Sequence, residues 1–111
     1  MRSHDGWVYF ASPAKMGIYR IQIGSDGGPQ GTPVTVEEGV RPDDFDVAAD
    51  GSVYFPSGPV LYKVAATGEV TKHADPIQGG PSAVVSANQQ WVYWPTRGGD
   101  NPQRLMRVAI P

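Results

Sequence analysis

One stretch of fourteen residues recurs along the chain, and this repeat restricts the fold more than any other feature of the sequence. Residues 42–55 read PDDFDVAADGSVYF, which is a short apolar strand, an Asp-Gly turn and a second apolar strand. Residues 5–10 (DGWVYF) match its second half in five of six positions, 45 residues earlier. Residues 81–94 align with all fourteen positions, 39 residues later. A period of about 40 residues built from short strands is typical of a β-propeller blade.

A second repeat confirms the spacing and defines three units. Residues 18–21, 61–64 and 105–108 share an apolar-apolar-basic-apolar pattern, which we expect on the third strand of each unit. The units are residues 1–40, 41–80 and 81–111. We expect the first unit to lack its inner strand and the last unit to lack its outer strand. Since unpaired edges invite another chain to pair with them, the economical interpretation is the C-terminal half of a propeller of about six blades, with both missing strands upstream.

The amino-acid composition agrees with many short strands joined by turns. Glycine and proline number 14 and 11 among 111 residues, and apolar residues alternate with them throughout. No stretch has a sustained helical period, so we predict an all-β fold of antiparallel, four-stranded blades and essentially no helix.

Charge and cysteine content exclude several classes of function. The net charge is -2, with 9 basic and 11 acidic residues and no block of like charge, which argues against nucleic acid or a membrane as a partner. Cysteine is absent, which excludes disulfides, thiolate nucleophiles and cysteine-ligated zinc. Neither a membrane span nor a signal peptide is visible, and a cytoplasmic location is the default expectation, although the sequence leaves the compartment open.

The basic residue of the second repeat falls at one structural position in each unit. These residues are Arg20, Lys63 and Arg107. A position repeated in every unit favours an exposed side chain whose stem packs on the sheet face over a functional site.

Several of these segments together resemble a known family. They are WVYF at 7–10, IYRIQI at 18–23, SDG at 25–27, DDFDVAADG at 43–51, GEVT at 68–71, GPSA at 80–83 and RVAI at 107–110. In this order they resemble the SMP-30/gluconolactonase/LRE-like propellers, with the closest likeness to a branch typical of filamentous-fungal secondary metabolism.

The resemblance implies a six-bladed propeller with its site at the top of the central channel. Members include calcium- or zinc-dependent lactonases, and some propellers of the secondary-metabolism branch are implicated as metal-free pericyclases, including hetero-Diels–Alderases. This chain begins its inner strand with Asp43, Asp44 and Phe45, where the metal enzymes carry glycine and asparagine. We therefore expect no metal cofactor, with Ca²⁺ or Zn²⁺ as the alternative.

The strongest candidate for a catalytic site is the pair Asp43 and Asp44. They stand where an inner strand begins, which in a propeller lies at the rim of the channel, and Ser82 holds the equivalent place in the next unit. Their oxygens could hold a hard cation or orient a substrate hydroxyl or carbonyl. The alternative is that aspartates beside Pro42 form a turn and bind nearby backbone N–H groups.

Arg41, Ser82 and Trp94 are the candidate substrate-binding residues. Arg41 precedes the inner strand and is placed to bind an anionic group or to pair with Asp43. Trp94 adjoins the loop of residues 95–100, which is a candidate lid, whereas most of the other strand aromatics are expected to pack between units.

The remaining polar residues have simpler expected roles. Asp5 and Asp50 precede glycine in hairpin turns and are expected to be structural. Asp46 alternates with apolar neighbours and faces either the channel or a polar partner on a neighbouring strand. His4 and His73 are expected at the surface, and no nucleophile-elbow pattern or convincing Ser-His-Asp triad occurs.

Two functions follow from these observations. The first is a propeller enzyme that binds a small secondary-metabolite substrate in its channel and acts as a metal-free pericyclase or as a lactonase-type hydrolase. The second is a non-catalytic half-propeller that closes a ring with an N-terminal half or with a second copy of itself.

Overall fold

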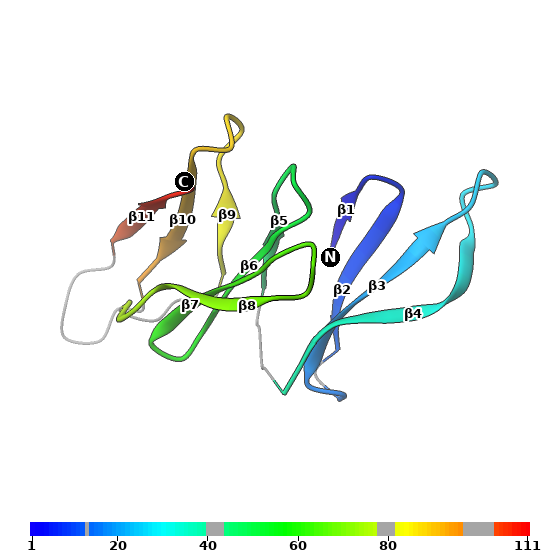
Figure 1. The fold of residues 1–111 in the computed structure, drawn as a ribbon, viewed down its shortest axis with the longest axis horizontal. Helices are drawn as coiled ribbons and strands as arrows, with labels where there is room; N and C mark the ends of the chain where they lie inside the picture. Colours follow the sequence, from blue (N-terminus) through cyan, green and yellow to red (C-terminus); the bar gives the residue numbers. More distant parts are fainter. Residues whose placement is uncertain (13, 40–43, 78–81, 97–103) are drawn as a thin grey trace.

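The computed structural model describes residues 1–12, 14–39, 44–77, 82–96 and 104–111, which form eleven strands and no helix. The strands are β1 (Arg2–His4), β2 (Trp7–Ser12), β3 (Gly17–Ile23), β4 (Pro29–Glu38), β5 (Asp46–Val47), β6 (Val53–Ser57), β7 (Val60–Val64), β8 (Val70–Ala74), β9 (Val84–Val85), β10 (Trp91–Pro95) and β11 (Leu105–Ala109). They form three antiparallel sheets in chain order, β1–β4, β5–β8 and β9–β11 (Figure 1). The predicted all-β, antiparallel class is confirmed, and sheets of this size are compatible with blades. In this part of the chain no helix is long and apolar enough to cross a membrane.

The first sheet has an inner strand that the sequence analysis missed, so the expectation that this unit lacks one is wrong. Strand β1 pairs antiparallel with β2. The two strands are joined by Asp5 and Gly6, whose φ angles of 50° and 81° are the conformation that two-residue hairpins prefer. With three residues, all of them polar, β1 is too short to show the alternation that identifies a strand.

The third sheet agrees with its expected strand count. Among the described residues it consists of β9, β10 and β11, with no outer fourth strand. Strand β11 pairs along its whole length with β10.

Turn length differs between units that align without a gap in sequence. Tyr54 pairs with Asp46 in the second sheet, and the ungapped alignment would pair its counterpart Tyr93 with Val85. In the structure Tyr93 pairs with Val84, one residue earlier. The turn of the second sheet has three residues, 49–51, inside its closing hydrogen bond, and the turn of the third sheet has four, 87–90. The extra residue moves the register by one position.

The Asp-Gly turn of the second sheet is held by its own side chain, which confirms the structural role predicted for Asp50. Its Oδ1 accepts a hydrogen bond from the Ser52 N–H at 2.9 Å, and Gly51 has a φ of 86°. This backbone hydrogen bond is the main reason that the pKa of Asp50 lies below its usual value.

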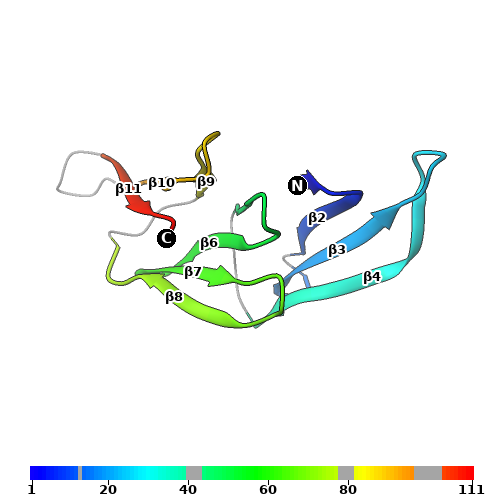
Figure 2. The same ribbon diagram turned by 45° about the horizontal axis from the view of Figure 1, so that its top comes forward.

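The three sheets pack face against face, with the second sheet in the middle (Figure 2). Val53 and Phe55 of β6 point to the first sheet, and Tyr54 between them points to the third, as the two-residue period of a strand requires. The core between the first and second sheets consists of Tyr9, Ile18, Phe45, Val53, Phe55 and Val64. The core between the second and third sheets consists of Ala48, Tyr54, Leu61, Ile77, Ala83, Val92 and Trp94. The second sheet is the most buried because both of its faces are covered.

The repeated basic residues lie over aromatic rings. The guanidinium of Arg20 lies 4.3 Å from the centre of the Trp7 ring, and that of Arg107 lies 3.9 Å from the centre of the Trp91 ring. In the second sheet Ser52 replaces the tryptophan. The expected exposed, stem-packed residue is therefore also a cation–π partner of the adjacent strand, an interaction worth about 0.5–1 kcal/mol at exposed sites.

Two tyrosines at the same position of the repeat differ in their hydrogen bonding, which predicts opposite effects of the same substitution. The Tyr9 hydroxyl accepts a hydrogen bond from Arg20 Nη1 at 3.2 Å. The Tyr54 hydroxyl is buried without a partner among the described residues. We expect Tyr9→Phe to lower the free energy of unfolding by about 1 kcal/mol, and Tyr54→Phe to leave it unchanged or raise it by up to about 1 kcal/mol. Urea unfolding at neutral pH measures both, and a larger loss for Tyr54→Phe than for Tyr9→Phe would contradict this reading.

The same pair predicts a dependence on alkaline pH. Burial of the hydroxyl, and then the negative charge of Asp50, raise the pKa of Tyr54 above its ordinary value of 10.0. As pH rises past that value, the unfolded chain releases this proton before the folded chain does, so stability falls. Because phenylalanine has no proton to release, Tyr54→Phe should lose less stability between neutral pH and pH above 10.0 than the unchanged chain does.

Candidate functional site

The inner strands β1, β5 and β9 of the three sheets lie next to one another, and Asp46 of β5 contacts all three. Its Oδ2 accepts a hydrogen bond from the Val85 N–H of β9 at 2.8 Å. Its Oδ1 accepts one from the Val47 N–H of its own strand at 2.9 Å and lies 3.3 Å from Arg2 Nε of β1. One carboxylate thus joins the inner edges of the three sheets.

Arg2 extends this cluster toward Asp44. Its Nε donates a hydrogen bond to the Phe45 carbonyl at 3.2 Å, and its Nη2 lies 3.8 Å from Asp44 Oδ2. The side chains of Arg2 and Asp44 are 38% and 40% exposed, whereas that of Asp46 is 19% exposed. Arg2 and Asp44 therefore form the accessible end of the cluster, and Asp46 the structural end.

The predicted catalytic residue Asp44 lies two residues before the first residue of β5, at this edge. Its Oδ1 accepts a hydrogen bond from the adjacent Phe45 N–H at 2.9 Å, which is the local turn contact foreseen as the alternative to a ligand role. Its Oδ2 lies 3.8 Å from Arg2 Nη2 and is the carboxylate oxygen available to bind a ligand. Asp43 and Arg41 lie outside the described residues.

The other two predicted residues lie apart from this edge and from each other. Ser82 lines a groove of about 430 Å³ with Val84, Tyr93, Pro95 and Leu105, on the face of the third sheet that points away from the second. Trp94 is 5% exposed and points the opposite way, into the core against the second sheet. Its burial favours the packing role expected for most strand aromatics over contact with a substrate. Among the described residues no hydrogen bond or ion pair joins Ser82 to Asp44.

Sequence reasoning missed Arg2 and left the role of Asp46 open. Arg2 is in the short polar strand that the sequence analysis missed. The sequence predicts that Asp46 faces either the channel or a polar partner on a neighbouring strand, and the structure supports the second role. The partner is a backbone N–H, which any residue provides, so nothing in the sequence could have identified Val85.

The cluster does not fit a metal site among the residues that the structure describes. They contain no group of three or more histidine, aspartate or glutamate side chains close enough to hold a metal ion. Asp44 and Asp46 both face the same guanidinium, whose positive charge repels a cation. A dedicated calcium site needs about 6–8 oxygen ligands.

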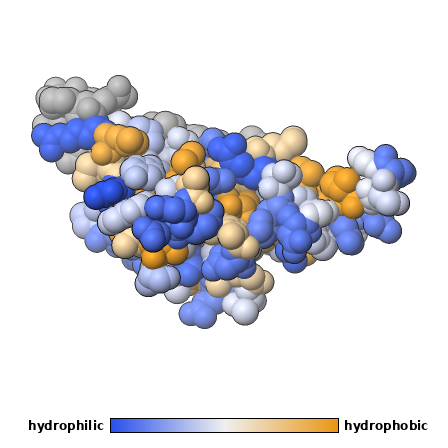
Figure 3. All heavy atoms as spheres, turned by 90° about the horizontal axis from the view of Figure 1, so that it is seen from above, coloured by the Kyte–Doolittle hydropathy of each residue, from blue (hydrophilic) through white to orange (hydrophobic). Residues whose placement is uncertain are grey.

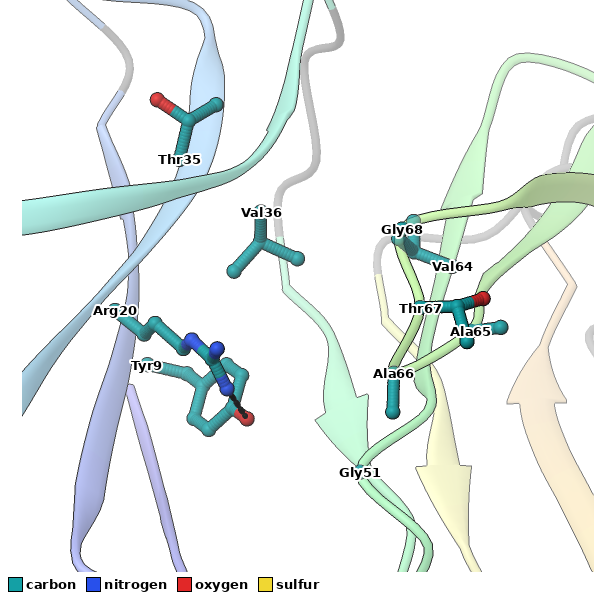
Figure 4. A pocket seen from close by; sticks show the side chains of 10 residues that line it. All are labelled: Tyr9, Arg20, Thr35, Val36, Gly51, Val64, Ala65, Ala66, Thr67 and Gly68. Carbon is teal, nitrogen blue, oxygen red and sulfur yellow. Dashed lines mark hydrogen bonds between the residues drawn. The ribbon is translucent and has the colours of Figure 1, made fainter.

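A separate pocket of about 190 Å³ lies between the first and second sheets, toward their outer strands (Figure 4). Arg20 and Tyr9 point into it from the first sheet, and the β7–β8 turn at residues 65–68 closes it from the second. Of the predicted site residues that the structure describes, Asp44, Ser82 and Trp94, none lines it. Because the Arg20 guanidinium already lies on Trp7 and binds the Tyr9 hydroxyl, its position is explained by packing between strands.

Comparison of the sequence with known protein families and with curated proteins finds no match. The likeness to SMP-30/gluconolactonase/LRE-like propellers therefore stays a prediction from the quoted segments.

The cluster predicts that two neighbouring aspartates differ in their effect on stability. We expect Asp46→Asn to lower the free energy of unfolding by about 1–3 kcal/mol, because it weakens a charge-assisted hydrogen bond to Val85 and the contact with Arg2. Asp44→Asn should lower it by less than about 0.5 kcal/mol, because its ion pair is exposed and long. Chemical unfolding of both variants tests this, and equal losses would contradict the assignment of Asp46 as the structural member.

Proposed function

We propose that the chain forms part of a β-propeller that binds a small organic molecule at the end of its inner strands. The supporting observation is the partly exposed pair of Arg2 and Asp44, at the edge where β1, β5 and β9 adjoin. The resemblance to SMP-30/gluconolactonase/LRE-like propellers implies a substrate bound near the starts of the inner strands, in the channel. The secondary-metabolism branch implies that this substrate is a lactone- or polyketide-like molecule.

The chemistry that this pair supports best is positioning without a covalent step. The Arg2 guanidinium donates hydrogen bonds to a carbonyl and withdraws electron density from it, and the Asp44 carboxylate accepts a hydrogen bond from a hydroxyl. A pericyclic ring closure needs the reacting carbons held in contact and a carbonyl activated in this way, and it needs no nucleophile or proton transfer. We therefore propose a metal-free pericyclase, of which a hetero-Diels–Alderase is the type most consistent with a polarised carbonyl.

Lactonase-type hydrolysis is the less favoured chemistry. It requires a water molecule activated by a metal ion or a general base. The described residues provide one exposed carboxylate at this edge, and it shares its free oxygen with a guanidinium.

The second candidate function is assembly, and a different observation favours it. The face of the third sheet that carries the Ser82 groove is apolar and has no sheet packed against it among the described residues. In this function the chain completes a ring of sheets with a partner half or with a second copy.

The ligand proposal predicts that Asp44→Asn weakens binding about tenfold, since a lost charge-assisted hydrogen bond costs about 1.5 kcal/mol. The experiment uses the propeller that contains this chain, screened by thermal shift against lactones and polyketide-like dienes. Isothermal titration with the best ligand then compares the variant with the unchanged protein. The matched control is Asp5→Asn, since asparagine is equally suited to the two-residue turn. Unchanged binding and turnover in Asp44→Asn would remove Asp44 from the site.

A further inference from the structure

We propose that the free face of the third sheet binds the free face of the first sheet in a second copy of this chain. We call the first surface the tail face; its residues are Val84, Trp91, Tyr93, Pro95, Leu105 and Arg107. We call the second surface the head face; its residues are Val8, Phe10 and Ile21, which are half-buried, and Tyr19, which is 8% exposed. The inference rests on the assembly candidate above and does not depend on ligand binding at Asp44.

The tail face is equivalent in the repeat to two sheet faces that are already buried inside the chain. Tyr9 of the first sheet is buried against the second sheet, and Tyr54 of the second is buried against the third. Tyr93 holds the same place in the repeat, and its neighbours Val92 and Trp94 point into the core. The alternation of β10 therefore directs Tyr93 to the opposite side. No sheet covers that side among the described residues.

The arginine of the tail face repeats an internal arrangement as well. Arg107 lies over Trp91 as Arg20 lies over Trp7, and the Arg20 arrangement belongs to the interface between the first two sheets. A charged residue at this position is thus compatible with a packed neighbour.

The head face is equivalent in the repeat to the faces of the second and third sheets that pack on the sheet before them. Val53 and Phe55 pack on the first sheet, and Val92 and Trp94 pack on the second. Val8 and Phe10 hold these positions in the first sheet, where Tyr9 between them points to the second sheet. They therefore point away from the stack.

Strand pairing widens the head face into a continuous surface. Val8 pairs with Ile21, and Phe10 pairs with Tyr19, so all four side chains lie on one side of the sheet. The rings of Phe10 and Tyr19 are in contact, with centres 6.0 Å apart.

Exposure marks the tail face as the less covered of the two. Leu105 is 70% exposed and Val84 is 46% exposed, and together with Ser82, Tyr93 and Pro95 they border the groove of about 430 Å³. The space-filling view shows apolar residues at the surface near both ends of the stack of sheets (Figure 3). A copy that places its head face here reproduces the packing of the first sheet on the second. Because the two faces differ, the contact is head-to-tail.

The test measures mass by sedimentation velocity over a concentration series of the 111-residue chain. We expect the unchanged chain to form a species larger than the 11.9 kDa monomer. Leu105→Asp on the tail face and Val8→Asp on the head face should each weaken self-association by about 30-fold or more. The control Val70→Asp replaces another exposed apolar residue, 42% exposed, on outer strand β8, and it should associate normally.

Mixing distinguishes head-to-tail packing from a symmetric contact. The Leu105→Asp chain keeps an intact head face, and the Val8→Asp chain keeps an intact tail face. An equimolar mixture should therefore form a heterodimer, while each variant alone sediments as a monomer. Near-ultraviolet circular dichroism and urea unfolding confirm that both variants are folded, and Leu105→Lys provides a second tail-face variant of opposite charge.

Three results would overturn the proposal. They are a monomeric unchanged chain at every concentration, association unaffected by Leu105→Asp and Leu105→Lys, or association that survives Val8→Asp. Asp44→Asn should associate normally. The Leu105 and Val8 variants therefore test association, and Asp44→Asn tests ligand binding, so either proposal can fail without the other.

Discussion

The Asp46 carboxylate is the group on which the relative placement of the three sheets depends, because it accepts a hydrogen bond from the Val85 N–H of the third sheet and pairs with Arg2 of the first. Apolar packing brings sheet faces together but tolerates sliding, whereas a carboxylate that bonds to three strands fixes their positions. A second polar contact supports it, since the Ala49 N–H donates a hydrogen bond to Gln89 Oε1 at 2.8 Å between the turns of the second and third sheets. With the inner strands fixed, Arg2 and Asp44 are held at the accessible end of the same edge.

The fold was largely predictable because its main signals are periodic. Alternating apolar residues and Asp-Gly turns located most strands, and the repeat indicated that they form similar units. Strand β1 escaped because three polar residues carry no period, and the register of β9 differs because turn length is invisible in an ungapped alignment. Strand β4 also begins at Pro29, within a run rich in glycine and proline, because pairing with β3 overrides the local preference of these residues.

The candidate site was predictable only in part. Asp44 is predicted from its place at the start of an inner strand. Asp46 was left open because its partner is a backbone N–H, and Arg2 was missed because it lies in a strand that sequence patterns do not show. The two proposals use different parts of the structure. The ligand proposal uses the polar inner edge, and the assembly proposal uses the apolar end faces. The sequence analysis attributes association to unpaired strand edges, whereas the assembly proposal attributes it to uncovered sheet faces. Docking of two faces needs shape complementarity and no backbone pairing.

Hydrogen exchange at the Val85 amide, followed by NMR, is the decisive measurement. If the Asp46 carboxylate holds the inner strands together, this amide should exchange as slowly as those of the buried strand β6, although its hydrogen bond goes to a side chain of another sheet. Exchange of the Val85 amide as fast as that of the exposed Asn88 amide, with β6 and β10 still protected, would show that the third sheet is not fixed to the second and would contradict the arrangement described.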